Sequence, residues 1–111
     1  MVVYIPCQGD IVDVDFNPTK GHEQRGKRPA MVISNAAYYK YTGLLIVCPI
    51  SNTESAFPMH IPLEDGMFTK GSVLTQHIRT IDPQARPVVF REAAPESLAR
   101  KVIHAVGLYI R

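Results

Sequence analysis

Apolar and acidic side chains alternate along the stretch Ile11-Val12-Asp13-Val14-Asp15-Phe16. Val12, Val14 and Phe16 share one face and the two aspartates share the other, which is the period of two of a half-buried β-strand. Asn17-Pro18 then ends this strand. The first predicted element is therefore a strand with one face in the core.

Two later stretches, 29–34 and 44–50, are apolar on both faces, which predicts central strands of a sheet. The connection 35–43 carries three tyrosines and is expected to form a short helical turn. Residues 57–63 alternate apolar side chains with Pro58, His60 and Pro62. Because both prolines lie on one face, this segment is predicted to be an edge strand.

Two more strands are predicted at 72–82 and 85–90, paired through a turn near Asp82-Pro83-Gln84. Six or so short strands in a row predict a closed or nearly closed sheet. From Pro95 onward the apolar side chains recur at helical spacing, at Leu98, Val102, Ala105, Val106 and Tyr109. The expected fold is mainly β, a small antiparallel barrel with a C-terminal α-helix.

The bulk composition indicates one globular domain over residues 1–111, with 46% hydrophobic and 20% charged side chains. The longest apolar run, 44–50, contains Pro49 and is far shorter than the ~20 residues of a membrane helix. The N-terminus lacks the basic start and long apolar stretch of a secretory signal. We therefore expect a cytoplasmic protein that does not span a membrane.

Cysteine and histidine give no sign of a cross-link or a metal site. Cys7 falls in a predicted loop and Cys48 in an apolar strand, so both are expected to be buried or idle thiols. The four histidines, at 22, 60, 77 and 104, lack the short paired spacings with cysteine or carboxylate that tetrahedral zinc sites use. We expect no metal ion and no other cofactor.

A net charge of +2 does not by itself identify a nucleic-acid-binding protein, but the charge is unevenly distributed. Residues 17–28 form a predicted long exposed loop with two glycines. Four cations in this loop, Lys20, Arg25, Lys27 and Arg28, oppose Glu23 alone, a local balance of +3. The loop could bind an anion, and His22 or Glu23 could move protons, although a solvated charged loop has the same composition.

Arg28 stands out because Pro29 and an apolar strand follow it directly, which places its stem at the rim of the sheet. Its planar head, with five donors, could hold a phosphate at two points and stabilise charge on a pentavalent phosphorus. The alternative is an ion pair with Asp13 or Asp15 of the preceding strand, and spacing alone does not separate the two.

Other polar candidates lie at the ends of or within the later strands. Ser51 follows an apolar strand and is better suited to hydrogen bonding than to nucleophilic attack, unless it is a plain turn residue. Gln76 and His77 alternate in the predicted strand, so only one of them faces the core. His77 could carry a proton, but a lone strand histidine is more often a satisfied polar group, and His60 and His104 are read that way.

The order Asn17-Pro18-Thr19-Lys20-Gly21-His22-Glu23-Gln24, then Gly26 and Arg28-Pro29, resembles the signature loop of the MazF/PemK endoribonuclease toxins. The preceding Gly9-Asp10-Ile11-Val12 is similar to the strand start of that family. Cys48-Pro49-Ile50-Ser51 and the segment 76–82 fall where the family has its equivalents. The resemblance covers essentially the whole chain.

This resemblance implies a homodimer of SH3-like barrels, of the CcdB/MazF/PemK type, that cleaves single-stranded RNA without a metal ion. Cleavage at short sequences in mRNA would leave a cyclic phosphate and a free 5′-hydroxyl, and would inhibit translation and growth. Arg28 matches the catalytic arginine of the family, Glu23 its loop glutamate and Ser51 a position usually held by threonine, with His22 a further catalytic candidate. The expected RNA-binding side chains are Lys20, Gln24, Arg25, Lys27, Gln76, His77 and Arg79.

The chain departs from the family pattern at two places. Serine at 51 keeps the hydroxyl of threonine but loses the methyl group that restricts its rotamers. PemK-like members use an arginine and an aspartate where this chain has Leu74 and Gln76, so the proton transfers fall to Arg28, Glu23, His22 or His77.

The family also implies an antitoxin whose flexible tail, acidic and studded with apolar side chains, covers the cleft and orders on binding. The rival interpretation from another functional class is a non-enzymatic inhibitor of DNA gyrase, as in the CcdB toxins. An RNA-binding or peptide-binding barrel without turnover is a third. The loop that contains Arg28 favours the nuclease.

Overall fold

The computed structural model describes residues 4–16, 27–52 and 58–111. Nine elements follow one another in this part of the chain: β1 (Asp10–Asp15), β2 (Lys27–Val32), α1 (Ala36–Thr42), β3 (Leu45–Ser51), β4 (His60–Pro62), β5 (Ser72–Leu74), β6 (Arg79–Ile81), β7 (Val88–Ala93) and α2 (Glu96–Ile110).

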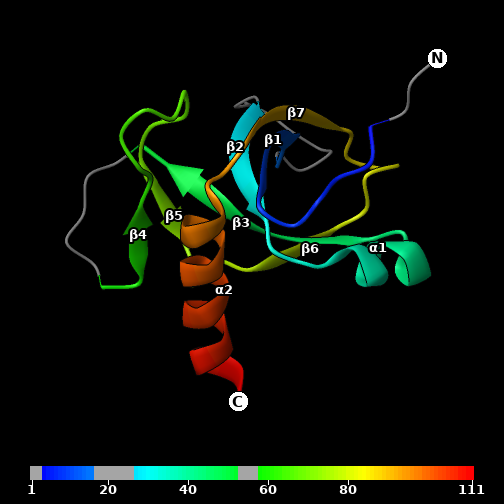
Figure 1. Ribbon diagram of the computed structural model, residues 1–111. Helices are drawn as coiled ribbons and strands as arrows, with labels where there is room; N and C mark the ends of the chain where they lie inside the picture. Colours follow the sequence, from blue (N-terminus) through cyan, green and yellow to red (C-terminus); the bar gives the residue numbers. More distant parts are fainter. Residues whose placement is uncertain (1–3, 17–26, 53–57) are drawn as a thin grey trace.

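The seven strands form one antiparallel sheet in the order β4-β5-β3-β2-β1-β7, and β6 pairs with β3 beside β5. The sheet curls, and α2 stands against it with its C-terminal end projecting beyond the strands (Figure 1). The mainly β fold with a C-terminal helix that the sequence predicts is confirmed.

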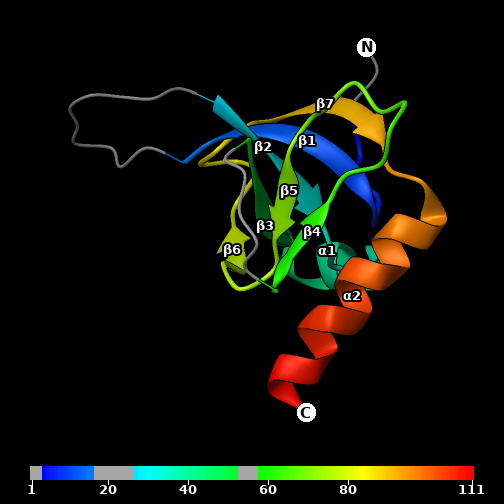
Figure 2. The same cartoon turned by 90° about the vertical axis from the view of Figure 1, so that its left-hand side faces the viewer.

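Both faces of the central strands are buried. One cluster contains Ile11, Met31, Cys48 and Ile50 from β1, β2 and β3, packed with Leu98, Val102 and Val106 of α2. The other contains Val12 and Val14, Ala30 and Val32, Leu45 and Val47, packed with Ile81. Figure 2 shows α2 lying across the side of the sheet that carries β4 and β5. Strands β2 and β3 are thus central, as their two apolar faces predict.

The remaining local predictions are largely confirmed. Strand β4 lies at one end of the sheet, where the two prolines placed it. Helix α1 begins after Asn35, whose side chain accepts a hydrogen bond from the Tyr38 backbone N–H, and ends at Gly43 in the left-handed conformation. Helix α2 begins just after Pro95.

The predicted pair of strands at 72–82 and 85–90 is wrong. A turn over residues 75–78 splits the first segment into β5 and β6, which both pair with β3. The second segment becomes β7 and pairs with β1. Gln76 and His77 therefore lie in a turn and do not alternate along a strand. Thr75 anchors this turn, since its buried hydroxyl bonds the Met59 carbonyl and the Tyr109 hydroxyl of α2.

Both cysteines are free thiols, Cys7 exposed and Cys48 buried. Burial raises the pKa of Cys48 to about 12, so its thiol stays protonated and behaves as an apolar core side chain. In the portions of the chain described, neither helix has the length and apolar character that crossing a membrane requires.

Candidate functional site

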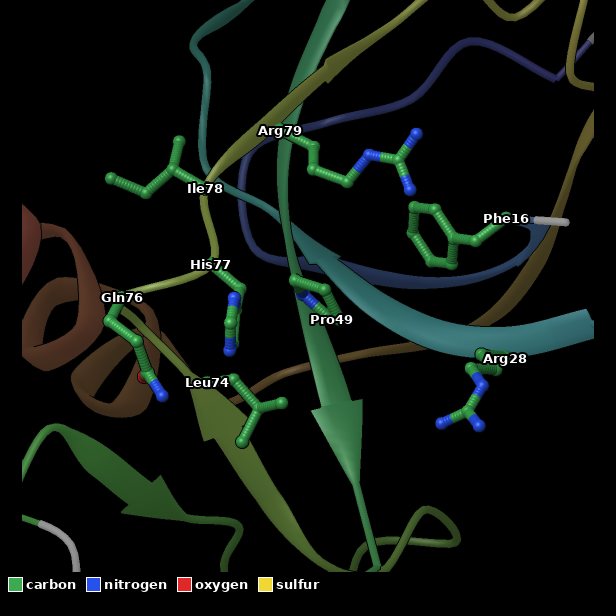
Figure 3. Close-up of a pocket in the computed structure, with 8 residues that line it drawn as sticks. All are labelled: Phe16, Arg28, Pro49, Leu74, Gln76, His77, Ile78 and Arg79. Carbon is green, nitrogen blue, oxygen red and sulfur yellow. The ribbon is translucent and has the colours of Figure 1, made fainter. Parts of the chain in front are cut away.

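A hollow of about 400 Å³ opens where the ends of several strands meet. Its walls come from the end of β1, from β2, β3 and β5, and from the turn between β5 and β6 (Figure 3). The lining side chains are Phe16, Arg28, Pro49, Leu74, Gln76, His77, Ile78 and Arg79. Four of these were singled out from the sequence, so the fold brings Arg28, Gln76, His77 and Arg79 to one place.

Arg28 is exposed at the start of β2 and is not tied up by Asp13. The Asp13 carboxylate instead pairs with Arg91, at 3.3 Å from its Nη1. Among the residues that the structure describes, no carboxylate pairs with Arg28. The proposed ion pair between Arg28 and Asp13 is therefore wrong, and the guanidinium is left available to an anionic ligand.

The β2–β3 ladder relates Arg28 to Ser51. Ala30 pairs with Pro49 and Val32 with Val47, so the same register continued by two residues puts Arg28 across from Ser51. Ser51 itself pairs with Ser72 at the start of β5. Gly71 precedes that strand with a φ of +117°, and a Cβ there would overlap the Ser51 backbone. A glycine is needed at 71 for β5 to approach the end of β3.

The turn after β5 supplies the opposite wall. Gln76 Nε2 lies 3.0 Å from His60 Nε2, which links the turn to β4. Arg79 places its guanidinium carbon 4.8 Å from the centre of the Phe16 ring, and Figure 3 shows the two side chains stacked at one side of the hollow. This cation–π contact holds both groups and leaves the guanidinium donors of Arg79 free to bind a ligand.

Sequence reasoning missed the apolar part of the wall. The sequence places Phe16 on a strand face and gives no site role to Pro49 or Ile78, and it marks Leu74 only as a departure from the family pattern, yet all four line the hollow. Their proximity to Arg28 and His77 follows from strand register, which no local motif encodes. The only available signal was alternation, since Pro49 lies two residues before Ser51 and so shares its face.

Part of the predicted site lies outside the described residues: Lys20, His22, Glu23, Gln24 and Arg25. Their assignments stay predictions. Lys27 is exposed at the start of β2, across from Asp15 in the β1–β2 ladder. His104 is exposed on α2, away from the residues that line the hollow. Over the described ranges 4–16, 27–52 and 58–111, no group of histidine, cysteine and carboxylate side chains is arranged to hold a metal ion.

The described wall of the hollow can donate hydrogen bonds and carries positive charge. Arg28 and Arg79 supply fixed forks of N–H donors, and the wall includes no aspartate or glutamate. His77 adds an imidazole, the side chain best suited to proton transfer near neutral pH. Such a site suits a phosphodiester, and the flat apolar surfaces of Phe16 and Pro49 suit a nucleobase beside it.

Comparison with known proteins identifies the class. Residues 7–110 match the family described as the PemK-like, MazF-like toxin of type II toxin–antitoxin systems. The chain is also 36% identical over 96 residues to the endoribonuclease toxin MazF of Escherichia coli K12, covering 86% of each protein. It is 34% identical over 100 residues to the E. coli endoribonuclease PemK, covering 86% of this chain and 75% of PemK.

The fold agrees with this assignment. The crystal structure of MazE–MazF (Form-II) from Deinococcus radiodurans superimposes with a TM-score of 0.89 at 34% identity, covering 97% of each chain. The chain therefore belongs to the PemK/MazF family of toxins, as the loop at 17–29 indicated.

Proposed function

We propose that this protein is the toxin of a type II toxin–antitoxin system and acts as an endoribonuclease on single-stranded RNA. The proposal rests on the exposed Arg28 guanidinium, which lies at a hollow whose described wall contains no acid. Endoribonuclease is also the activity named for the related MazF and PemK. Inhibition of DNA gyrase, the CcdB-like alternative, is not favoured, because these relatives are endoribonucleases.

Scission without a metal ion has three requirements, and this chain has candidates for each. The 2′-hydroxyl of the substrate must lose a proton, the pentavalent phosphorus must be stabilised, and the leaving 5′-oxygen must gain a proton. Arg28 is the group for the second step, since its fork can hold two phosphoryl oxygens while negative charge develops. The products are a 2′,3′-cyclic phosphate and a 5′-hydroxyl.

His77 is the proton carrier at the described wall, and Glu23 and His22 are the candidates in the loop outside it. Ser51, across from Arg28 in register, is proposed to hydrogen-bond a phosphoryl oxygen. Gln76, Arg79 and Lys27 are proposed to bind the flanking RNA, with Lys20, Gln24 and Arg25 from the loop. DNA should bind without being cut, because the attacking hydroxyl belongs to the ribose.

We further propose three features of its biological setting. A cognate antitoxin would cover the hollow with a flexible acidic tail, in line with the MazE–MazF complex of D. radiodurans. The working unit would be a homodimer in the cytoplasm. The exposed Leu108 and Ile110 at the end of α2 are apolar side chains suited to a dimer contact.

The test incubates a long single-stranded RNA with the parent protein or with Arg28→Ala, both in excess chelator. The parent should cut at discrete sites, and the variant should lose activity by on the order of 10²-fold or more, because the phosphorane loses its fork. Lys101→Ala removes an exposed cation from α2 and serves as the matched control, with parental cutting expected.

Two results would contradict the proposal. Equal cutting by the parent and Arg28→Ala would remove Arg28 from the mechanism. If neither protein cuts RNA and the parent instead traps gyrase on DNA, the protein is a non-enzymatic inhibitor of DNA gyrase.

A further inference from the structure

A second hollow, of about 350 Å³, lies beside the first and shares Arg28 with it. Its wall consists of Arg28, Pro29, Ile50, Asn52, Phe68, Thr69, Lys70 and Arg91. By strand alternation, Pro29 and Ile50 belong to the sheet face covered by α2, whereas Pro49 of the first hollow belongs to the other face. Arg28, close to the end of its strand, is thus accessible from both faces.

A carboxylate fixes the segment that forms one wall of this hollow. Glu92 accepts hydrogen bonds from the backbone N–H of Phe68 at 3.1 Å, the backbone N–H of Thr69 at 2.7 Å and the Thr69 hydroxyl at 2.6 Å. Burial works to raise the pKa of Glu92, but these hydrogen bonds and the charge of Arg91 hold it below its ordinary value of 4.5. The connection between β4 and β5 is therefore held in place at Thr69, which is only 1% exposed.

A β-bulge explains how Arg91 joins the same network. Ile11 pairs with Glu92 and Val12 with Phe90, so Arg91 is the extra residue on β7. In a regular strand Arg91 and Glu92 would point to opposite faces, whereas here both contact the Thr69 hydroxyl. Arg91 also pairs with Asp13, so its charge is largely balanced.

Lys70 and Arg28 differ from Arg91 in this respect. Both are exposed, and within the part of the chain that the structure describes neither pairs with a carboxylate. The hollow thus offers two cations without a balancing acid, on a wall that the Glu92 hydrogen bonds keep in position. Because the backbone next to Lys70 is held at Thr69, ordering the Lys70 side chain on a phosphate costs less conformational entropy than it would on a mobile segment.

Phe68, between Thr69 and the turn before it, is 80% exposed although folding normally buries phenylalanine. An exposed aromatic ring next to unpaired cations is the combination with which proteins bind single-stranded nucleic acids, because bases stack on the ring while cations contact the phosphates.

We propose that the second hollow binds the nucleotide next to the scissile phosphodiester of the RNA, with Phe68 stacked on its base and Lys70 on its phosphate, while Arg28 holds the scissile phosphate where the two hollows meet. This inference rests on the proposed nuclease function and extends it. The two hollows meet at Arg28, so two consecutive nucleotides of one RNA molecule can occupy them. Glu92 is a positioning residue, since it does not line the hollow and acts on the wall through its hydrogen bonds to Phe68 and Thr69.

The test measures binding of a 2′-O-methyl oligoribonucleotide, which cannot be cleaved, by fluorescence anisotropy at several salt concentrations. Phe68→Ala and Lys70→Ala should each weaken binding by on the order of fivefold to tenfold. The slope of log K for association against log salt should become less negative by about 0.7 for Lys70→Ala, the value for one phosphate contact on a single strand, and stay unchanged for Phe68→Ala. Tyr41→Ala, on the exposed side of α1, and Lys101→Ala are matched controls with parental affinity expected.

Shortening the RNA gives an independent readout. On a substrate that lacks the nucleotide proposed to occupy the second hollow, Phe68→Ala and Lys70→Ala should cleave at the same rate as the parent. On longer substrates that contain this nucleotide, both variants should cleave more slowly than the parent. Parental affinity and salt slope in both variants would overturn the inference while leaving the result for Arg28→Ala, and hence the proposed function, untouched. A loss confined to an acidic peptide, with RNA binding intact, would assign the hollow to a protein partner and also overturn it.

Discussion

Arg28 and Arg91 line the same hollow, but among the residues that the structure describes only Arg91 has a carboxylate partner. Arg91 contacts Asp13 and the Thr69 hydroxyl and joins β7 to β1 and to the wall segment. Arg28 lies at the end of its strand with an exposed guanidinium. Both arginines carry charge and lie near the hollow, so these two features do not separate them. The contrast predicts that Arg28, which has no carboxylate partner among the described residues, is the one that binds a ligand.

The largest effect is expected from a substitution that keeps the positive charge at position 28 but replaces the planar guanidinium. Arg28→Lys should lower RNA cutting by on the order of tenfold to 10²-fold, because an ammonium cannot contact two phosphoryl oxygens in a fixed plane. The measurement is the initial rate on a defined RNA, with Lys101→Arg as the matched control. A lysine variant as active as the parent would reduce Arg28 to a source of charge.

The free energy of unfolding should depend more on Arg91 than on Arg28, the reverse of what we expect for RNA cutting. Arg91→Ala should lower the free energy of unfolding by about 1 kcal/mol, since it removes the ion pair with Asp13 and the hydrogen bond that the Thr69 hydroxyl accepts, while Thr69 keeps its bond to Glu92. Arg28→Ala should change it by less than about 0.5 kcal/mol, as for an exposed side chain without such contacts. Urea unfolding of both variants beside the parent measures the difference, and equal losses would show that the pairing of Arg91 adds nothing.

The smallest expected effect is a pH dependence that arises from Glu92. Its folded-state pKa is lowered, so the stability it contributes is present above its ordinary value of 4.5 and is lost as pH falls through the lowered value. Glu92→Gln keeps a carbonyl acceptor but cannot ionise. The gap in unfolding free energy between parent and variant should therefore be widest near about pH 7 and should close toward about pH 3. A gap that is constant over this range would exclude ionised Glu92 as the cause.

Much of the architecture was predictable from local pattern. Alternation at 11–16, double-sided apolar runs at 29–34 and 44–50, prolines at the edge strand and helical spacing after Pro95 each gave the correct element. These features were predictable because a strand or helix that must bury one face needs apolar side chains at a fixed period. The loop at 17–29 likewise indicated the PemK/MazF family, to which the chain belongs.

The site itself was predictable only in part. Arg28, Gln76, His77 and Arg79 were singled out and do line one hollow, whereas Phe16, Pro49, Leu74 and Ile78 were not assigned to it. Lys70, Phe68 and Arg91 carried no signal at all, since each is an isolated residue in an unremarkable segment. Their proximity to Arg28 depends on the hydrogen bonds of Glu92 and on the bulge in β7.

The amino-acid sequence by itself determined most of the segments that become strands or helices, though not the turn that separates β5 from β6, and it determined the family to which the chain belongs. Both are encoded by residues close together in the chain. Only the tertiary structure decided the partner of each strand and of each charge. Asp13 and Arg91 are 78 positions apart, and Asp13 had nearer basic candidates in Lys27 and Arg28. The ion pair between Asp13 and Arg91 forms because both faces of the sheet are buried and the strand register places the two residues close together. Neither feature can be predicted from a short segment of sequence.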